Sequence, residues 1–393
     1  MNAQGAARPP VQDLLAGLVA FDTVSRNSNL PLLEHVRAFL DAQGIASSIA
    51  MDPHDSGKAG LLATIGPTDA PGIVLSGHMD VVPVDGQPWS SDPFTARFDG
   101  GRIYGRGTCD MKGFLAACLS VVPAIRDMNL VRPVHLAFSH DEEVGCKGSK
   151  VLLDHMKERL PHRPLGCVVG EPTQMKPVDG HKGKIAARVT ITGREGHSAL
   201  THETVNAVLH AGRLIGHLAD VADRLAAEAP AAGRGFLPPH TTMSIGRIEG
   251  GSQINIVPRS CTFEMEFRTL PGEDPQEHLA RVIDHARTHL LPDMKERAEE
   301  ADIAFSTFLA YPGFRAPAGD PFVATCIDLA GGDPPGKVSY GTEAGWFQDY
   351  DIPTIVCGPG DMSVAHKPDE HVETAQLDLA RTFILDLAGK LAT

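Results

Sequence analysis

The sequence predicts an α/β domain that is interrupted by a smaller ferredoxin-like α+β unit. Its length of 393 residues exceeds what one hydrophobic core usually serves, which favours two domains. Short apolar runs alternate with helical patterns up to about residue 180, as is typical of an α/β sheet. From Lys184 the order of strands and helices differs, and the α/β pattern returns after Pro312. We therefore expect one domain at 1–182 and 314–393, with the insertion at 183–313.

The first segment contains two helical patterns and three strand-like runs. The helical patterns cover 31–43 and 113–125, and the apolar runs cover 73–76, 134–138 and 167–169. Each apolar run stops at polar residues. We therefore expect the side chains that carry chemistry to lie where these strands end.

The middle segment follows the β-α-β-β-α-β order of ferredoxin-like units. Its predicted elements are a strand at 185–192, a helix at 202–228, strands at 241–248 and 260–270, a helix from Pro275 and a strand at 303–311. After Pro312 the sequence returns to a helix at 321–329, a strand at 354–356 and a C-terminal helix from Thr374. The two outer segments are therefore assigned to one domain.

The composition argues against several classes of function. The 49 acidic and 35 basic residues give a formal charge of −14, whereas nucleic acid binding needs clustered Lys and Arg. No apolar run is long enough to span a membrane, and the opening MNAQGAARPP lacks a secretory pattern, so we expect a cytoplasmic protein. The seven cysteines contain no CxxC pair, and we expect no disulfides.

Polar residues that suit a metal site follow the predicted strands. In open α/β sheets, ligands collect beyond the carboxyl ends of the strands. Five segments contribute here: His78 and Asp80, then Asp110, then Asp141, Glu142 and Glu143, then Glu171, and finally His366. Imidazole and carboxylate ligands together favour zinc, cobalt or manganese, and the number of these residues suggests two metal ions.

The spacing of these residues suggests separate tasks. In an extended segment residues two apart face the same way, so Asp80 can hydrogen-bond the imidazole of His78 and orient it. Neighbours point oppositely, so one of Glu142 and Glu143 can be a ligand and the other a base. Singly, His78 could be a satisfied strand-end histidine and the glutamates a solvated turn. The coincidence of five segments favours a site.

The motifs HMDVVP, GRGTCDMKG, DEEVG, GEPT and AHKPDE resemble the signatures of the acetylornithine deacetylase and succinyl-diaminopimelate desuccinylase family of two-metal amidohydrolases. The resemblance implies a metal-binding α/β domain with a mixed central sheet, interrupted by an inserted dimerisation domain. It also implies a homodimer and two divalent metal ions, zinc in the first place and cobalt as an alternative.

The same resemblance assigns roles to individual residues. One metal is held by His78, Asp110 and Glu171, and the second by Glu143 and His366, with Asp110 as the bridge. Glu142 is the general base, and His197 stabilises the oxyanion in the partner subunit's site. His197 could also be an ordinary surface histidine. A cis peptide bond is expected between Asp110 and Met111.

The expected reaction is hydrolysis of the amide of a small N-acylated amino acid, with N2-acetylornithine in arginine biosynthesis preferred. The segment YGTEAGWF resembles the deacetylase subgroup, and Glu343 could pair with a substrate ammonium. Thr342 or Glu343 could instead cap a helix. Arg268 and Asn255 match positions that grip the acidic end of the substrate, although Arg268 could be structural.

Other functions remain as alternatives. The same metal core serves succinyl-diaminopimelate desuccinylases and broader aminoacylases or metallo-exopeptidases. A non-catalytic metal-binding homologue would normally lack a ligand or the base, and none of the seven core positions is missing here. The chain contains no HExxH, GxSxG or P-loop motif.

Overall fold

The computed structural model describes residues 10–228 and 230–392, and the chain divides into two compact units. The first unit comprises the described residues up to Asp179, Ala316–Gly336 and the described residues from Thr342 onward. The second unit comprises Gly180–Arg315 and Lys337–Gly341. The sequence patterns predicted domain boundaries after residues 182 and 313, close to those of the structure. They did not predict that the short segment Lys337–Gly341 belongs to the second unit.

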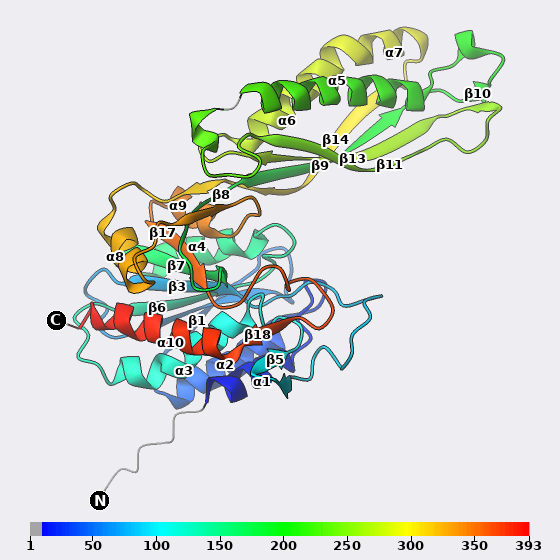
Figure 1. Cartoon of the computed structure of the whole chain (residues 1–393). Helices are drawn as coiled ribbons and strands as arrows, with labels where there is room; N and C mark the ends of the chain where they lie inside the picture. Colours follow the sequence, from blue (N-terminus) through cyan, green and yellow to red (C-terminus); the bar gives the residue numbers. More distant parts are fainter. Residues whose placement is uncertain (1–9, 229, 393) are drawn as a thin grey trace, which may run out of the picture. The chain divides into compact units, whose positions relative to one another are not determined.

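A mixed sheet of nine strands has most of its strands in the first unit (Figure 1). The strand order is β1-β2-β6-β3-β7-β17-β8-β15, and β16 pairs with β8. The bounds are β1 Ser47–Met51, β2 Ala59–Ile65, β3 Ile73–His78, β6 Val134–Ser139, β7 Gly166–Pro172, β8 Val178–His181, β15 Phe314–Arg315, β16 Gly336–Val338 and β17 Thr354–Gly358. The neighbours β6, β3, β7 and β17 are parallel, whereas β1, β2, β8 and β15 pair antiparallel.

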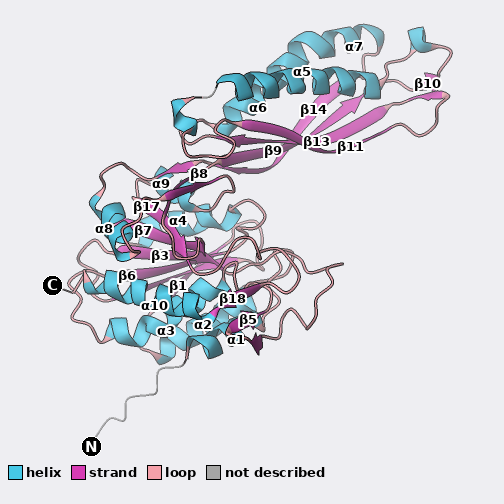
Figure 2. Cartoon of the chain, viewed as in Figure 1, coloured by secondary structure: helices cyan, strands magenta, loops and turns pink. Residues whose placement is uncertain are grey.

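Helices cover both faces of this sheet (Figure 2). One face carries α1 (Val11–Val19), α2 (Leu30–Ala42), α3 (Lys112–Arg126), α8 (Pro321–Leu329) and α10 (Thr374–Gly389), whose buried side chains form one hydrophobic cluster with the strands. The other face carries α4 (Lys147–Arg159) and α9 (Ala344–Asp349). A small sheet of β4 (Arg97–Asp99), β5 (Arg102–Tyr104) and β18 (His371–Glu373) completes the unit.

The central strands are buried along their whole length because helices cover both faces. Every residue of β3, β6 and β7 is buried, which explains the continuous apolar runs in the sequence. The predicted strands at 73–76, 134–138 and 167–169 are confirmed, and each extends to the polar residues that follow. The predicted fold class is therefore confirmed for this unit.

The second unit has the predicted ferredoxin-like order. Its sheet, β11-β13-β9-β14, is antiparallel, and α5 and α6 pack on one face. The elements are β9 (Gly183–Thr192), β10 (Gly196–His197), α5 (Ala207–Glu228), β11 (Thr242–Gly250), β12 (Ile256–Val257), β13 (Ser260–Thr269), α6 (Pro275–His285), α7 (Leu291–Arg297) and β14 (Asp302–Tyr311). Short 3-10 turns lie at Thr201–Glu203 and Ala231–Gly233, and a π-helical turn at Ala286–Leu290.

The long helix of the second unit begins at Ala207 rather than at residue 202. Thr201–Glu203 forms a separate 3-10 turn, and Val205 pairs with Arg194 in an isolated bridge. The side chain of Asn206 then accepts a hydrogen bond of 3.1 Å from the backbone N–H of Leu209, as a helix N-cap does. A local cap therefore sets the start of the helix, which the apolar pattern alone did not reveal.

None of the helices in the described part of the chain has the length and apolar character that crossing a bilayer requires. All seven cysteines are free and buried.

Candidate metal-dependent active site

The strand ends of the first unit bring the predicted metal-site residues together. His78 ends β3, Glu171 lies in β7, and Glu142 and Glu143 follow β6. Because these strands are parallel, their carboxyl ends meet at the same edge of the sheet. Potential ligand atoms of His78, Glu142 and Glu171 lie within 4.8 Å of one another, and so do those of His78, Asp110 and Glu143.

Asp110 lies between two imidazoles. Its Oδ1 is 3.1 Å from Nε2 of His78, and its Oδ2 is 3.1 Å from Nε2 of His366. Burial opposes ionisation of Asp110, but hydrogen bonds from His366 and His78 outweigh it and hold the pKa of this carboxyl well below its ordinary value. An ionised carboxylate whose two oxygens face different imidazoles has the geometry of a ligand shared by two cations.

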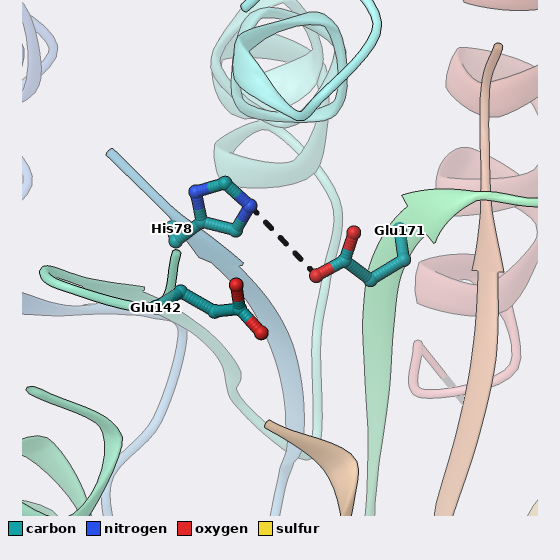
Figure 3. A group of neighbouring side chains, drawn as sticks. All are labelled: His78, Glu142 and Glu171. Atoms are coloured by element: carbon teal, nitrogen blue, oxygen red, sulfur yellow. Dashed lines mark ion pairs between the residues drawn. The ribbon is translucent and has the colours of Figure 1, made fainter. Parts of the chain in front are cut away.

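Two further carboxylates flank the histidines. Oε1 of Glu171 lies 3.8 Å from Nε2 of His78, and Figure 3 shows this pair with Glu142 beside it. Oε2 of Glu143 lies 3.2 Å from Nε2 of His366, whereas its Oε1 is buried and has no hydrogen-bond partner among the described residues. Each imidazole therefore lies near one further carboxylate in addition to that of Asp110.

Burial and neighbouring carboxylates oppose ionisation of the three glutamates at this site. Burial and the neighbouring Asp110 raise the pKa of Glu171 well above its ordinary value and that of Glu143 to about 7. Burial also raises the pKa of Glu142 to about 8. Hydrogen bonds to Asp110 and Glu143 raise the pKa of His366 to about 11, so in the absence of a cation this imidazole supplies the positive charge. Such a set of neighbouring histidines and carboxylates fits divalent cations, which would displace these protons.

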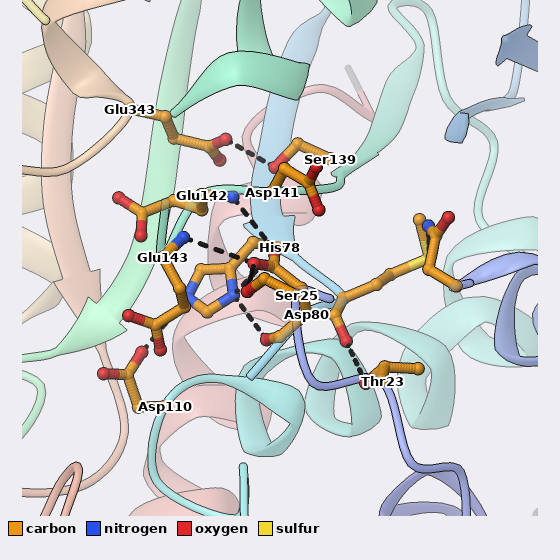
Figure 4. A network of polar contacts seen from close by, with 12 residues as sticks. Thr23, Ser25, His78, Asp80, Asp110, Ser139, Asp141, Glu142, Glu143 and Glu343 are labelled. Carbon is orange, nitrogen blue, oxygen red and sulfur yellow. Dashed lines mark hydrogen bonds and ion pairs between the residues drawn. The ribbon is translucent and has the colours of Figure 1, made fainter. Parts of the chain in front are cut away.

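The spacing predicted that the side chain of Asp80 orients His78, but the close contact comes from its backbone oxygen. Nδ1 of His78 lies 2.9 Å from the backbone oxygen of Asp80 but 3.6 Å from its carboxylate. The carbonyl, rather than the carboxylate, therefore makes the close contact that turns Nε2 toward Asp110. The carboxylate of Asp80 instead accepts hydrogen bonds from the backbone N–H of Glu142 at 3.0 Å and of Glu143 at 3.3 Å (Figure 4). Asp80 thus also holds the loop that carries both glutamates.

Two residues that the sequence analysis did not select support this loop. The thiol of Cys146 donates a hydrogen bond of 3.1 Å to Oε1 of Glu142. Lys58 is almost fully buried, and its Nζ lies 2.6 Å from the carboxylate of Asp141, which adopts a positive φ of 52°. The spacing DEEVGC, with the thiol four residues after Glu142, was the available signal for Cys146.

The structure argues against the expected pairing of Glu343 with a substrate ammonium. Glu343 is fully buried, and its oxygens accept hydrogen bonds from three serine hydroxyls, Ser76 at 2.6 Å, Ser139 at 2.7 Å and Ser149 at 3.0 Å. The contact with Ser139 is drawn in Figure 4. Thr342 is also buried, and its hydroxyl accepts from the backbone N–H of Ala344 at the start of α9. The contacts of both residues are structural.

The other three predicted residues belong to the second unit. His197 is exposed on β10, and its Nδ1 accepts a hydrogen bond of 3.1 Å from the backbone N–H of Ala199, which leaves the proton on Nε2. Asn255 is exposed. Arg268 is partly buried and lies 3.0 Å from Glu266 through its Nε, while its Nη1 donates to Tyr311.

The peptide bond between Asp110 and Met111 is cis, as the resemblance implied.

Comparisons with known proteins identify the family of this chain. A family model described as Peptidase family M20/M25/M40 matches residues 74–390. The acetylornithine deacetylase of Myxococcus xanthus is 35% identical over 94% of this chain and 94% of its own length. That of Proteus mirabilis (strain HI4320) is 33% identical over 95% and 92%. An M20 family metallo-carboxypeptidase from Sulfolobus solfataricus shares the fold, with a TM-score of 0.76 and 18% identity over 98% of this chain and 99% of that chain.

Proposed function

Because the chain belongs to the peptidase family M20/M25/M40 and is a metal-dependent amidohydrolase, we propose that it hydrolyses N2-acetylornithine to ornithine and acetate. The curated relatives named acetylornithine deacetylase match nearly the whole chain at 35% and 33% identity, and they support this substrate. The observation that carries the chemistry is Asp110, whose two oxygens each face a different histidine at 3.1 Å. The proposed reaction would belong to arginine biosynthesis, and a cytoplasmic location is part of the same proposal.

In this proposal two zinc ions are the cofactors. His78, Asp110 and Glu171 would hold the first, and Asp110 would also contribute to the second together with two further residues, Glu143 and His366. When bound, the cations lower the pKa of a water and polarise the carbonyl of the amide. Cobalt suits the same imidazole and carboxylate ligands.

Glu142 is the proposed general base. Its carboxylate belongs to the same cluster as His78 and Glu171. It also accepts a hydrogen bond from the thiol of Cys146, which orients the carboxylate and carries no positive charge. It takes the proton of the attacking water and delivers it to the leaving nitrogen, which departs as an amine. A buried carboxyl whose pKa is raised toward neutral is suited to both steps.

His197 of the partner subunit is the proposed donor to the developing oxyanion, which makes the active unit a homodimer. The proton on Nε2, implied by the hydrogen bond that Nδ1 accepts, supports a donor role. Arg268 and Asn255 are the proposed contacts to the carboxylate of the substrate. The contact of Arg268 with Glu266 must then be exchanged or shared when substrate binds.

The substrate is tested by rates on matched pairs. N2-acetylornithine, N-acetyl-diaminopimelate, N-succinyl-diaminopimelate and a dipeptide, each with added zinc or cobalt, separate deacetylation from desuccinylation and from exopeptidase activity. We expect the largest kcat/KM with N2-acetylornithine. Since Glu343 is tied to three serines, preference for the ornithine side chain must come from other residues. A larger kcat/KM with the succinyl substrate or the dipeptide would replace this assignment while leaving the metal chemistry intact.

A further inference from the structure

A connected group of polar side chains ties the loop that carries Asp110 to the loop that carries His366. It consists of Arg106, Glu370 and Gln87, which we call the Arg106 network. Arg106 forms hydrogen bonds with both Glu370 and Gln87. Glu370 and Gln87 in turn form hydrogen bonds with the backbone of a proposed ligand. None of them belongs to the proposed ligand set.

One end of the Arg106 network holds the backbone of Asp110. Glu370 is fully buried, and its Oε1 accepts hydrogen bonds from the backbone N–H of Cys109 at 2.9 Å and of Asp110 at 3.1 Å. The backbone oxygen of Glu370 also accepts a hydrogen bond from the backbone N–H of Gly105. Two adjacent amides bound to one carboxylate oxygen fix where the main chain of Asp110 lies.

The other end holds the backbone of His366. Oε2 of Glu370 pairs with Nη1 of Arg106 at 2.5 Å, and both side chains are fully buried. Nη2 of Arg106 donates to Oε1 of Gln87 at 2.6 Å, and Nε2 of Gln87 donates to the backbone oxygen of His366 at 2.9 Å. An unbroken series of hydrogen bonds therefore runs from the amide of Asp110 to the carbonyl of His366.

The His366 loop has a conformation that needs such support. His366 has a φ of 63° and Asp369 a φ of 55°, both in the left-handed region that residues with side chains rarely adopt. These turns bring the chain back so that Glu370 reaches Asp110. The side chain of Asp369 also accepts from the backbone N–H of Ser90 at 3.0 Å. The imidazole of His366 is half exposed, so its own packing holds it only in part.

Stability alone is a poor account of the buried pair. Replacing a buried ion pair by apolar residues of similar size is often neutral or stabilising, because desolvation offsets the attraction. An ion pair that connects two loops carrying metal ligands can instead act on metal binding, because residues that hydrogen-bond to ligands orient them and change metal affinity.

We propose that the Arg106 network is a positioning device for the second metal site. It sets the separation of 3.1 Å between Oδ2 of Asp110 and Nε2 of His366 by holding the main chain of both residues. The first site depends on it less, because His78 and Glu171 lie on strands of the sheet. This inference rests on the proposed two-metal function and extends it to residues that contact neither metal nor substrate.

The test compares variants of the network with a matched exposed pair. Gln87→Met removes the donor to His366, Glu370→Gln removes the charge, and Arg106→Met removes the cation. The control is Arg102→Met and Glu373→Gln, an exposed Arg–Glu pair 3.3 Å apart in the neighbouring small sheet. Stepwise zinc affinities are measured by equilibrium dialysis of the full-length protein, with thermal unfolding of the same samples.

We expect the second zinc to bind about 10- to 100-fold more weakly in the network variants. The first zinc should be weakened less, because Asp110 is the only one of its proposed ligands whose main chain the network holds. Both control variants should bind both ions normally. Arg106→Met leaves Glu370 buried without its partner and can fail to fold. Gln87 is only half-buried, and Gln87→Met leaves the ion pair of Arg106 and Glu370 intact. This variant therefore provides the test if Arg106→Met does not fold.

Unchanged affinities in folded Gln87→Met, or an equal loss at both sites, would overturn the positioning role. Wild-type protein that binds fewer than two zinc ions would overturn the proposed function instead. The two failures are therefore distinguishable, because the first concerns only the variants and the second concerns the wild type.

Discussion

The acidic cluster of the first unit and the sheet of the second unit differ in how their charged side chains are arranged. In the first unit, Asp110, Glu143 and Glu171 are crowded together at the edge of the sheet, and burial, together with repulsion from Asp110, raises the pKa of both glutamates. In the second unit, opposite charges pair on the sheet, as in the contacts of Glu266 with Lys184 on the neighbouring strand at 2.6 Å and with Arg268 on its own strand at 3.0 Å. A buried cluster of crowded acidic groups is destabilising unless a ligand such as a cation binds there, whereas paired charges on a sheet surface need no ligand.

The largest expected effect comes from removing the base while keeping the metals. Glu142→Ala should lower kcat by about 10²- to 10⁴-fold, because no other group would accept the proton of the attacking water. Both metal ions should remain, since the proposed ligands are untouched. Metal analysis and steady-state rates on one sample check both parts. A variant that keeps wild-type turnover would refute the mechanism.

The next effect separates the two metal positions. His366→Ala should lose the second metal and keep the first, because His366 contacts Asp110 and Glu143 but is not among the contacts of Glu171. Bound zinc per chain, measured after dialysis against limiting metal, should fall from two equivalents to one. His371→Ala is a matched control, because this histidine lies on β18 and its Nδ1 contacts the backbone oxygen of Asp369. Two equivalents in His366→Ala would exclude it as a ligand.

A smaller effect is the dependence of stability on pH in metal-free protein. Burial raises the pKa of Glu142 to about 8 and of Glu143 to about 7, so the folded state binds more protons than the unfolded state. The free energy of unfolding should therefore fall as the pH rises from about 5 to about 8. In the second unit a hydrogen bond from Lys184 lowers the pKa of Glu266 despite its burial, and this contribution has the opposite sign, being lost in acid.

Urea unfolding of the metal-free protein across this pH range measures the slope. Glu143→Gln should reduce it, because an amide has no proton to lose, and bound zinc should remove it. Stability that rises with pH between about 5 and about 8 in metal-free protein would show that the glutamates are not held as the structure has them.

The sequence predicted those parts of the site that depend on strand ends. His78, Glu142, Glu143 and Glu171 follow apolar runs directly, and the parallel arrangement of those runs suffices to bring them together. The apolar patterns likewise predicted the central strands. They did not predict α4, whose sequence KGSKVLLDHMKER has few apolar residues and begins with small and charged ones.

The missed features depend on contacts between distant segments. Glu343 is bound by serines from β3, β6 and α4, and no local pattern in YGTEAGWF shows that they meet. In the same way, Asp80 is two residues from His78, yet its carboxylate serves the backbone of Glu142, 62 positions away. Spacing along the chain identifies which residues are near a site, but the direction of a side chain follows from tertiary packing.

The smallest expected effect comes from a charge pair on the sheet of the second unit. Arg188 and Glu264 face each other across β9 and β13 with 2.7 Å between Nη2 and Oε1, and their side chains are 55% and 28% exposed. A double-mutant cycle of Arg188→Ala and Glu264→Ala should give a coupling of about 0.2–1 kcal/mol, since water screens such pairs. Breaking the buried pair of Arg106 and Glu370 should destabilise the fold by about 3–5 kcal/mol. Equal effects at the two pairs would mean that burial does not distinguish the charges of the two units, and the contrast between them would fail.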